Sequence, residues 1–276
     1  MSPDKWFLQV KFYKYMGYKL NLKNPKTFNE KLQWLKLYDR NPLYTTLVDK
    51  YRVKQYVAEK IGEEYVIPTL AVYNSVDEIE LDKLPDQFVL KCNHDSGSIV
   101  ICRDKSTFDL TAAKEKLSKA LKNNYYSDSR EWPYKNVARC IFAEEYINHD
   151  DDLYDYKFFC FNGTVKYYKI DYDRPSIHHA TYFDREGNEL PYYEMVCPKT
   201  ENKQFDILCE EIETMISLSE RLSKKFPFAR IDFYCNYGSI KFGECTLYPT
   251  AGFGAFSNID FEMALGDGIN INQVNK

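Results

Sequence analysis

The sequence has no Cys-x-x-Cys pair, no block of basic residues and no long apolar run. The eight cysteines are scattered among apolar neighbours, so the paired spacing of zinc ligands is missing. We expect them to be reduced core residues of a cytosolic protein. No apolar run approaches the roughly 18 residues of a membrane span, and the first residues do not resemble a signal peptide. Any work at a membrane would therefore be done from the aqueous side.

Positive charge is also scarce, because the net charge is -4 at pH 7. This argues against a protein whose main task is to bind nucleic acid. The four histidines show no metal-ligand spacing, and no Ser-His-Asp or Cys-His arrangement stands out. The content of 44% hydrophobic and 28% charged residues is typical of a soluble globular protein. The 276 residues suffice for one large domain or two small ones.

Helical and strand patterns alternate, and hairpins are frequent. Thr27 to Glu30 fits a capping box and predicts a helix that ends near Tyr38. Asp49 is a suitable N-cap for a second helix, which ends near Gly62, and a third helix is predicted over 205–225. Strands are predicted at 88–92, 99–102, 139–147, 156–161 and 164–170, with a hairpin at 180–190. The pattern indicates an α+β fold with two lobes that meet near 147–156.

The segment 229–246 reads as a β-hairpin, because two β-branched and aromatic arms flank a turn with Asn and Gly. Side chains alternate between the faces of a strand, so Arg230 and Asp232 share a face, as do Glu244 and Thr246. If the turn holds an odd number of residues, all four lie on the same face.

Two carboxylates on neighbouring strands, with Cβ atoms about 5 Å apart, repel one another unless a cation lies between them. Oxygen ligands suit Mg²⁺, and an arginine on the same face offers donors to phosphate oxygens. The hairpin therefore predicts a divalent metal bound together with a phosphate. The alternative is a buried structural ion triad of Arg230, Asp232 and Glu244.

Two lysines are weaker candidates for phosphate binding. Lys91 ends an apolar strand before a polar loop, where it can hold a phosphate or simply point to solvent. Lys50 follows Asp49 at a helix start, and the plain interpretation is a cap followed by a solvated lysine.

Two acidic segments have a similar ambiguity. Glu144, Glu145, Tyr146 and Ile147 end an apolar strand, where the backbone can pair with an adenine or form a solvated acidic turn. Asp155 and Lys157 share a face of the next strand. They are either a surface ion pair or contacts to a ribose hydroxyl and a phosphate.

The order of these motifs along the chain resembles that of the ATP-grasp superfamily. Asp49 and Lys50 come first, then Lys91, then Glu144 to Ile147, and finally Arg230 and Asp232 with the later Glu244. More narrowly, the chain resembles the ATP-grasp proteins of the teichuronopeptide-biosynthesis type, which are found in capsule and cell-surface polysaccharide clusters. The narrower resemblance is carried by Asn24 to Leu32, Leu90 to His94 and Asp155 to Gly163. It extends from about Gly17 to Gly266.

The resemblance implies two α+β lobes that grip ATP between them. It assigns 1–62 to a helical N-terminal segment, 63–147 to a small ATP-grasp lobe and 148–276 to a large lobe with the metal site. The short helical segment replaces the separate N-terminal domain that is common in the superfamily.

The resemblance also implies a role for each candidate residue. Lys50 and Lys91 would hold the α- and β-phosphates, Glu144 to Ile147 would meet adenine, and Asp155 would reach the ribose. Asp232 and Glu244 would bind one or two Mg²⁺ ions, and Arg230 would stabilise the transferring phosphoryl group. Thr246 stands where the family usually has Asn, so the second ion would be held mainly by Asp232, Glu244 and the nucleotide.

The implied activity is ATP-dependent carboxylate–amine ligation through an acylphosphate, in the cytoplasm or at the inner face of the membrane. The expected carboxylate is a uronic acid of a polysaccharide or its precursor, and the co-substrate is an amine or amino acid. Arg174, His178 and His179 are candidates for the sugar-binding surface. Two rival interpretations remain, a metal-dependent glycosyltransferase and a non-catalytic nucleotide-binding scaffold.

Overall fold

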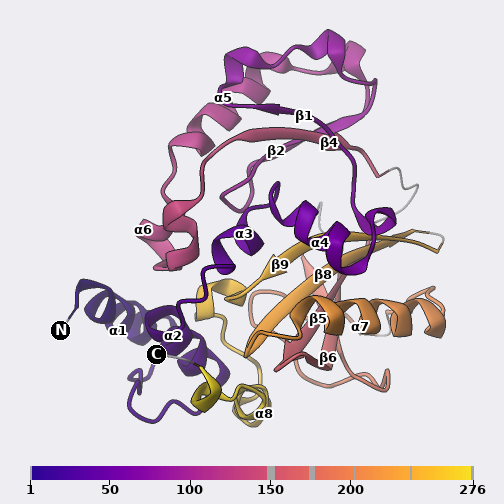
Figure 1. Cartoon of the computed structure of the whole chain (residues 1–276). Helices are drawn as coiled ribbons and strands as arrows, with labels where there is room; N and C mark the ends of the chain where they lie inside the picture. The colour runs from indigo at the N-terminus through magenta and orange to yellow at the C-terminus, as the bar shows by residue number, and fades with distance from the viewer. Residues whose placement is uncertain (1, 148–152, 174–177, 202, 237, 275–276) are drawn as a thin grey trace. The chain divides into compact units, whose positions relative to one another are not determined.

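The computed structural model describes residues 2–147, 153–173, 178–201, 203–236 and 238–274. They form an α+β structure with two antiparallel sheets, as predicted (Figure 1). The chain divides into two compact units. The first, called the large unit here, comprises Met1–Asn41 and Asp151–Lys276, and the second, called the small unit, comprises Pro42–Asp150.

The small unit is built on a four-stranded sheet in the order β1-β4-β2-β3. Its strands are β1 (Thr69–Tyr73), β2 (Phe88–Cys92), β3 (Ile99–Cys102) and β4 (Ile141–Glu145). Leu117 of α5 (Leu110–Lys122) packs in a core with Phe88, Leu90 and Ile141 on one face of this sheet. The odd-numbered residues of β2 and their neighbours form the other face.

Three further helices of the small unit are α3 (Tyr44–Val48), α4 (Val53–Ile61) and α6 (Tyr125–Ser129). Asp49 accepts hydrogen bonds from the backbone N–H groups of Tyr51 and Arg52, as a capping residue does. The regular helix nevertheless begins only at Val53, because residues 50–52 form a turn.

The large unit contains a five-stranded sheet in the order β7-β6-β5-β8-β9. Its strands are β5 (Asp155–Phe161), β6 (Thr164–Tyr172), β7 (His179–Asp184), β8 (Phe228–Asn236) and β9 (Ser239–Thr246). Helix α7 (Cys209–Ser223) lies along one face (Figure 1). It starts later than predicted, because Leu208 is extended. The predicted hairpin at 180–190 is present in a short form. Phe183 bridges Glu189, and backbone hydrogen bonds join Asp184 to Asn188 and Leu190 to Tyr182, but the second arm is not a regular strand.

Three helices complete the large unit, namely α1 (Pro3–Met16), α2 (Phe28–Tyr38) and α8 (Ile259–Gly268). The predicted capping box of Thr27 and Glu30 is present. The Phe28 ring packs 5.0 Å from that of Phe228 on β8, which fixes α2 to the large sheet. A Cβ on Gly266 would meet the carbonyl oxygen of Lys26 at 2.1 Å, so only glycine allows α8 this approach. The helical residues 1–62 are thus divided between the two units.

The β8–β9 register explains how the hairpin residues come to share a face. Asn236 pairs with Ser239, which leaves two residues in the turn and not the odd number that we considered. A bulge near Gly243 then shifts the register by one, so that Asp232 faces Glu244 and Arg230 faces Thr246. Without this extra residue, Glu244 and Thr246 would point to the opposite face.

The eight cysteines are free, as predicted. Six are buried, but Cys209 is exposed and Cys235 is half-buried, so the prediction that all are core residues was wrong for these two. No helix in the described part of the chain has both the length and the apolar character that crossing a bilayer requires.

Candidate functional site

A row of charged side chains crosses the face of the large sheet that lies opposite α7. We call it the charged row. Seven of its members come from β5, β6, β8 and β9, and one comes from the segment after β7. The members are Asp155, Lys157, Lys169, Asp171, Glu194, Arg230, Asp232 and Glu244. All but Glu244 are buried. Burial of this many charges is costly unless each is paired or bound by a ligand.

Arg230 anchors one end of the charged row. Its Nε and Nη2 atoms donate to the two carboxylate oxygens of Asp232, both at 2.7 Å. Nη2 also lies 3.2 Å from Oε1 of Glu244 and 3.0 Å from Oγ1 of Thr246. Burial alone would lower the pKa of Arg230, but Asp232 and Glu244 raise it well above the usual value. The guanidinium therefore keeps its charge.

Lys157 occupies the centre of the charged row. Its Nζ atom lies 2.6 Å from Oδ2 of Asp155, 2.5 Å from Oδ2 of Asp232 and 3.8 Å from Oδ2 of Asp171. Asp155 and Lys157 are each 3% exposed, so the interpretation as a surface ion pair was wrong. One ammonium group here joins carboxylates from three neighbouring strands.

The other end of the charged row contains residues that the sequence did not single out. Lys169 Nζ lies 3.3 Å from Asp171 and 3.6 Å from Glu194, and these acids raise its pKa although burial lowers it. His178 Nε2 lies 3.0 Å from Oδ2 of Asp171. Contact with Asp171 and with Cys197 raises the pKa of His178 to about 9. The imidazole is therefore mostly protonated at neutral pH.

Carboxylates outnumber permanent cations among the members of the charged row. It has five carboxylates and three permanent cations, and protonated His178 lies beside Asp171. Burial raises the pKa of Asp232, although Arg230 and Lys157 oppose the rise. A bound cation would relieve this cost.

Asp232, Glu244 and Thr246 offer the oxygen donors that Mg²⁺ prefers. Among the described residues, no three His, Cys, Asp or Glu side chains form a group that could hold a metal ion. The protein would thus supply two carboxylates and a hydroxyl, and phosphate oxygens and water would supply the rest. Oδ2 of Asp232 accepts hydrogen bonds from both Arg230 and Lys157, whereas Oδ1 accepts one from Arg230, so Oδ1 has the lone pair that suits a metal ion.

A second cluster lies in the small unit, where Glu144 joins two lysines. Lys54 Nζ lies 2.8 Å from Oε2 of Glu144, and Lys91 Nζ contacts Oε1. Lys91 therefore does not simply point to solvent. Burial would raise the pKa of Glu144, but Lys91 and Lys54 outweigh it and lower that pKa. Two ammonium groups held by one carboxylate leave a net positive charge.

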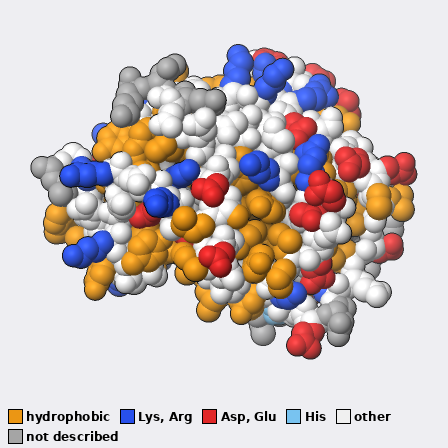
Figure 2. Space-filling model, turned by 90° about the horizontal axis from the view of Figure 1, so that it is seen from below, with side chains coloured by type: hydrophobic (Ala, Val, Ile, Leu, Met, Phe, Trp, Pro, Cys, Tyr) orange, Lys and Arg blue, Asp and Glu red, His pale blue; other side chains and the backbone are white. Residues whose placement is uncertain are grey.

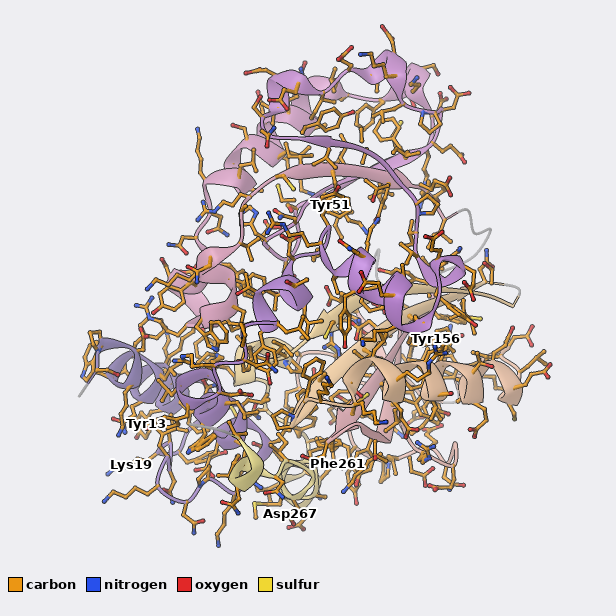
Figure 3. The ribbon with its side chains drawn as sticks, viewed as in Figure 1. Tyr13, Lys19, Tyr51, Tyr156, Phe261 and Asp267 are labelled. Carbon is orange, nitrogen blue, oxygen red and sulfur yellow. The ribbon has the colours of Figure 1, made fainter. Side chains whose placement is uncertain are left out.

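The sheet face beside this cluster is apolar and partly open. Val72, Ile99 and Ile101 are 41%, 38% and 48% exposed, and the strand register puts them on the same face as Lys91. The ring of Tyr51, labelled in Figure 3, packs 6.0 Å from that of Phe142 on this face. Exposed apolar side chains next to paired lysines suit a ligand with a flat ring and an anionic group.

The remaining predicted residues of the small unit lie at several places around the sheet. The backbone N–H of Lys50 donates to the carbonyl oxygen of Asn93 at 3.0 Å, which ties the turn before α4 to the loop after β2. Glu145 and Tyr146 line a shallow hollow of about 1170 Å³. Ile147, the last predicted contact to adenine, is half-buried. Arg174, a predicted sugar contact, lies outside the described residues.

The sequence analysis missed Lys54, Lys169, Asp171 and Glu194. Lys54 follows Lys50 by four residues, which is the helical spacing of neighbours on one face. Lys169 and Asp171 alternate as Asp155 and Lys157 do, and antiparallel pairing puts the two sets opposite each other. No local signal marks Glu194, because only the folded chain brings it to Lys169.

A family model described as TupA-like ATPgrasp matches residues 30–270. This match confirms the family resemblance and the ATP-grasp fold predicted from the sequence. No curated protein matched the chain.

Several solved structures are distantly similar. D-alanine–D-alanine ligase from Bacillus anthracis is 17% identical with a TM-score of 0.42, over 77% of this chain and 62% of that chain. L-amino acid ligase from Bacillus licheniformis is 12% identical with a TM-score of 0.47, over 81% of this chain and 49% of that chain. D-alanine–D-alanine ligase from Helicobacter pylori is 13% identical with a TM-score of 0.48, over 90% of this chain and 70% of that chain. The chain thus spans less than two thirds of the first two ligases.

Proposed function

Because the chain belongs to the TupA-like ATP-grasp family, we propose that it is an ADP-forming carboxylate–amine ligase. The observation that carries this proposal is the charged row, in which an arginine, two lysines and several carboxylates share one sheet face. Such a face suits the transfer of a phosphoryl group, which needs positioning and charge neutralisation more than covalent help.

The proposed reaction has two steps. A carboxylate oxygen of the substrate attacks the γ-phosphorus of ATP, the bond to the β–γ bridging oxygen breaks, and ADP leaves. The amine nitrogen then attacks the acyl carbon of the acylphosphate, phosphate leaves, and the amine gives up a proton to solvent. The product is an amide.

Arg230 is the proposed catalytic residue in the large unit. Its guanidinium stays charged and offers several N–H donors in a fixed fork, which suits the charge that develops on the transferring phosphoryl oxygens. Asp232 orients the fork through two hydrogen bonds, and Lys157 holds Asp232 from the other side. Asp155 and Lys157 are the proposed contacts to the ribose and a phosphate.

Asp232, Glu244 and Thr246 are the proposed ligands of one or two Mg²⁺ ions. When bound, Mg²⁺ neutralises charge on the phosphate oxygens. Glu244 is the most accessible carboxylate of this set, since its side chain is 39% exposed.

In the small unit, Lys50 and Lys91 are the proposed contacts to the α- and β-phosphates. Glu144 orients Lys91, and Lys54 in turn holds Glu144. The backbone from Glu144 to Ile147 is the proposed contact to adenine, and the apolar sheet face around Val72 and Ile101 suits a base.

The proposed carboxylate is a uronic acid of a cell-surface polysaccharide or its precursor, and the amine is an amino acid or another amine. His178 is protonated at neutral pH and half-exposed, so it suits contact with an acidic sugar. We place the reaction in the cytoplasm, where ATP is available.

A screen of uronic-acid and amine pairs for ADP release tests the proposal. The full chain should release ADP from ATP only with Mg²⁺ and a carboxylate. Hydroxylamine should trap the acylphosphate as a hydroxamate. A glycosyltransferase would instead release a nucleoside diphosphate from a nucleotide-sugar without ATP, and a scaffold would bind ATP without turnover.

Matched variants locate the chemistry. Asp232→Asn and Glu244→Gln should each lower the turnover rate by about 100-fold or more. Glu213→Gln, which changes an exposed carboxylate on α7 of the same unit, should leave it unchanged. Normal turnover in both site variants would show the metal assignment to be wrong.

A further inference from the structure

Helix α1 is held to the large unit by one face only. Leu8 and Phe12 on that face are fully buried, and the ring of Phe12 packs edge-on against Tyr18 at 5.1 Å. Tyr15, toward the end of the helix, packs 5.7 Å from Phe253. The helix is therefore an anchored element of the fold, with a fixed orientation relative to the rest of its unit.

The opposite face of α1 is apolar and exposed. Trp6, Val10 and Tyr13 are 62%, 52% and 58% exposed. They follow the spacing i, i+4, i+7, so they form one stripe along the helix. The stripe lies opposite Leu8 and Phe12, because 3.6 residues make one turn. A tryptophan and a tyrosine on one exposed helix face need an explanation, since such rings usually find cover.

Exposed lysines occur in α1 and in the segment that follows it. Residues 1–26 contain six lysines and one acidic residue, although the whole chain has a net charge of -4. Lys14, Lys19, Lys23 and Lys26 are exposed. Tyr13 and Lys19 lie on the same outer side of the large unit (Figure 3). The left end of Figure 2, where α1 lies, shows basic side chains among hydrophobic ones.

We propose that the outer face of α1 docks on an anionic lipid bilayer. Tryptophan and tyrosine prefer the boundary between headgroups and acyl chains, where their apolar rings and polar tips are both satisfied. Lysines beside them attract anionic headgroups within about a Debye length of the surface. The strength of such binding depends on the apolar area that is buried and on electrostatic attraction to anionic lipids, and the stripe and the lysines supply one of these each.

A protein partner fits this surface less well. Stable protein interfaces bury about 800 Å² on each side around a closed apolar centre. One stripe of three large side chains bordered by flexible lysines is narrow by that measure. The charge pattern also matches a surface that is uniformly negative over a wide area, as an anionic membrane is.

Co-sedimentation of the full chain with vesicles tests this proposal. The chain should bind vesicles made of equal parts phosphatidylglycerol and phosphatidylcholine, and bind phosphatidylcholine vesicles weakly. Salt at about 1 M, where the Debye length falls to about 3 Å, should release most of it. Equal binding to both vesicle types would overturn the proposal. So would a chain that ignores vesicles but self-associates through α1.

Two sets of variants place the contact at α1. The double variant Lys14→Gln, Lys19→Gln should weaken vesicle binding by about tenfold or more. The matched double variant Lys119→Gln, Lys122→Gln removes two exposed charges near the end of α5 and should bind as the unaltered chain does. An equal loss in both variants would mean that only net charge matters, and the α1 site would be wrong.

Tryptophan emission gives a readout at the stripe itself. The chain has three tryptophans, and Trp34 is buried. Anionic vesicles should shift the emission to shorter wavelength, and Trp6→Phe should abolish most of that shift while vesicle binding persists. A shift that survives in Trp6→Phe would contradict the insertion of this face.

Discussion

The ammonium group of Lys157 lies 2.5 Å from Oδ2 of Asp232, across the β5–β8 pair. The same ammonium group also contacts Asp155. Lys157 and Arg230 therefore both neutralise the carboxylate that is proposed to bind metal. Lys157 is also a shared counter-ion for carboxylates on three strands.

Replacement of Lys157 by Met should lower the free energy of unfolding by roughly 3–5 kcal/mol, because buried carboxylates would lose their shared cation. Urea unfolding near neutral pH measures the loss. The loss should shrink in acid, where protonated carboxylates need no cation. Lys166→Met, at an exposed position on the neighbouring strand β6, is the control and should change stability little. Equal stability of both variants would contradict the pairing.

Glu144 should contribute a stability that depends on pH. Its pKa is lowered in the folded protein by Lys91 and Lys54, against the effect of burial. The contribution is therefore present above the ordinary glutamate pKa of about 4.3 and is lost as the pH falls through the folded-state pKa. The difference in unfolding free energy between the unaltered chain and Glu144→Gln should be full near neutral pH and smaller in acid. A difference that is constant with pH would refute the assignment.

His178 should titrate far above an ordinary histidine, with a pKa of about 9. Asp171 is the main cause, so Asp171→Asn should return the pKa toward the usual value of about 6.5. The ring proton signals of the four histidines, followed by NMR against pH, report this directly. A normal titration of His178 in the unaltered chain would exclude the contact.

Thr246→Asn should strengthen metal binding. The hydroxyl of Thr246 lies 3.2 Å from Oε1 of Glu244, and the family resemblance implies an asparagine at this position. An amide oxygen is a better neutral ligand for Mg²⁺ than a hydroxyl, so half-maximal ADP release should need several-fold less Mg²⁺. Thr250→Asn, which changes a threonine outside the sheet, is the control. An unchanged Mg²⁺ requirement would show that residue 246 does not contact the metal.

Local patterns in the sequence predicted most of the strands. The strand β2 and the hairpins β5–β6 and β8–β9 were predicted because apolar and aromatic alternation is a short-range property. The capping box before α2 was predicted for the same reason. The hairpin at 180–190 was predicted from the same local pattern, and its second arm pairs with β7 through one bridge and two backbone hydrogen bonds without becoming a regular strand.

The candidate site was predicted in part. Arg230, Asp232, Glu244 and Thr246 were found because two adjacent strands carry them. Glu194 was not found, because its contact to Lys169 joins residues 25 positions apart through a segment without regular structure. The division of the N-terminal helices between two units was also missed, since α2 is placed by Phe228 and not by its neighbours in sequence.

The sequence by itself determined that four polar side chains stand at alternate positions of one hairpin. The tertiary structure decided that they share a face, through the bulge at Gly243, and that Lys157 contacts Asp232. Within the small unit, it also decided that Glu144 pairs with both Lys91 and Lys54. The physical reason is that alternation along a strand is set by local backbone geometry. The compensation of a buried charge, in contrast, depends on whichever residues the fold brings within a few ångströms.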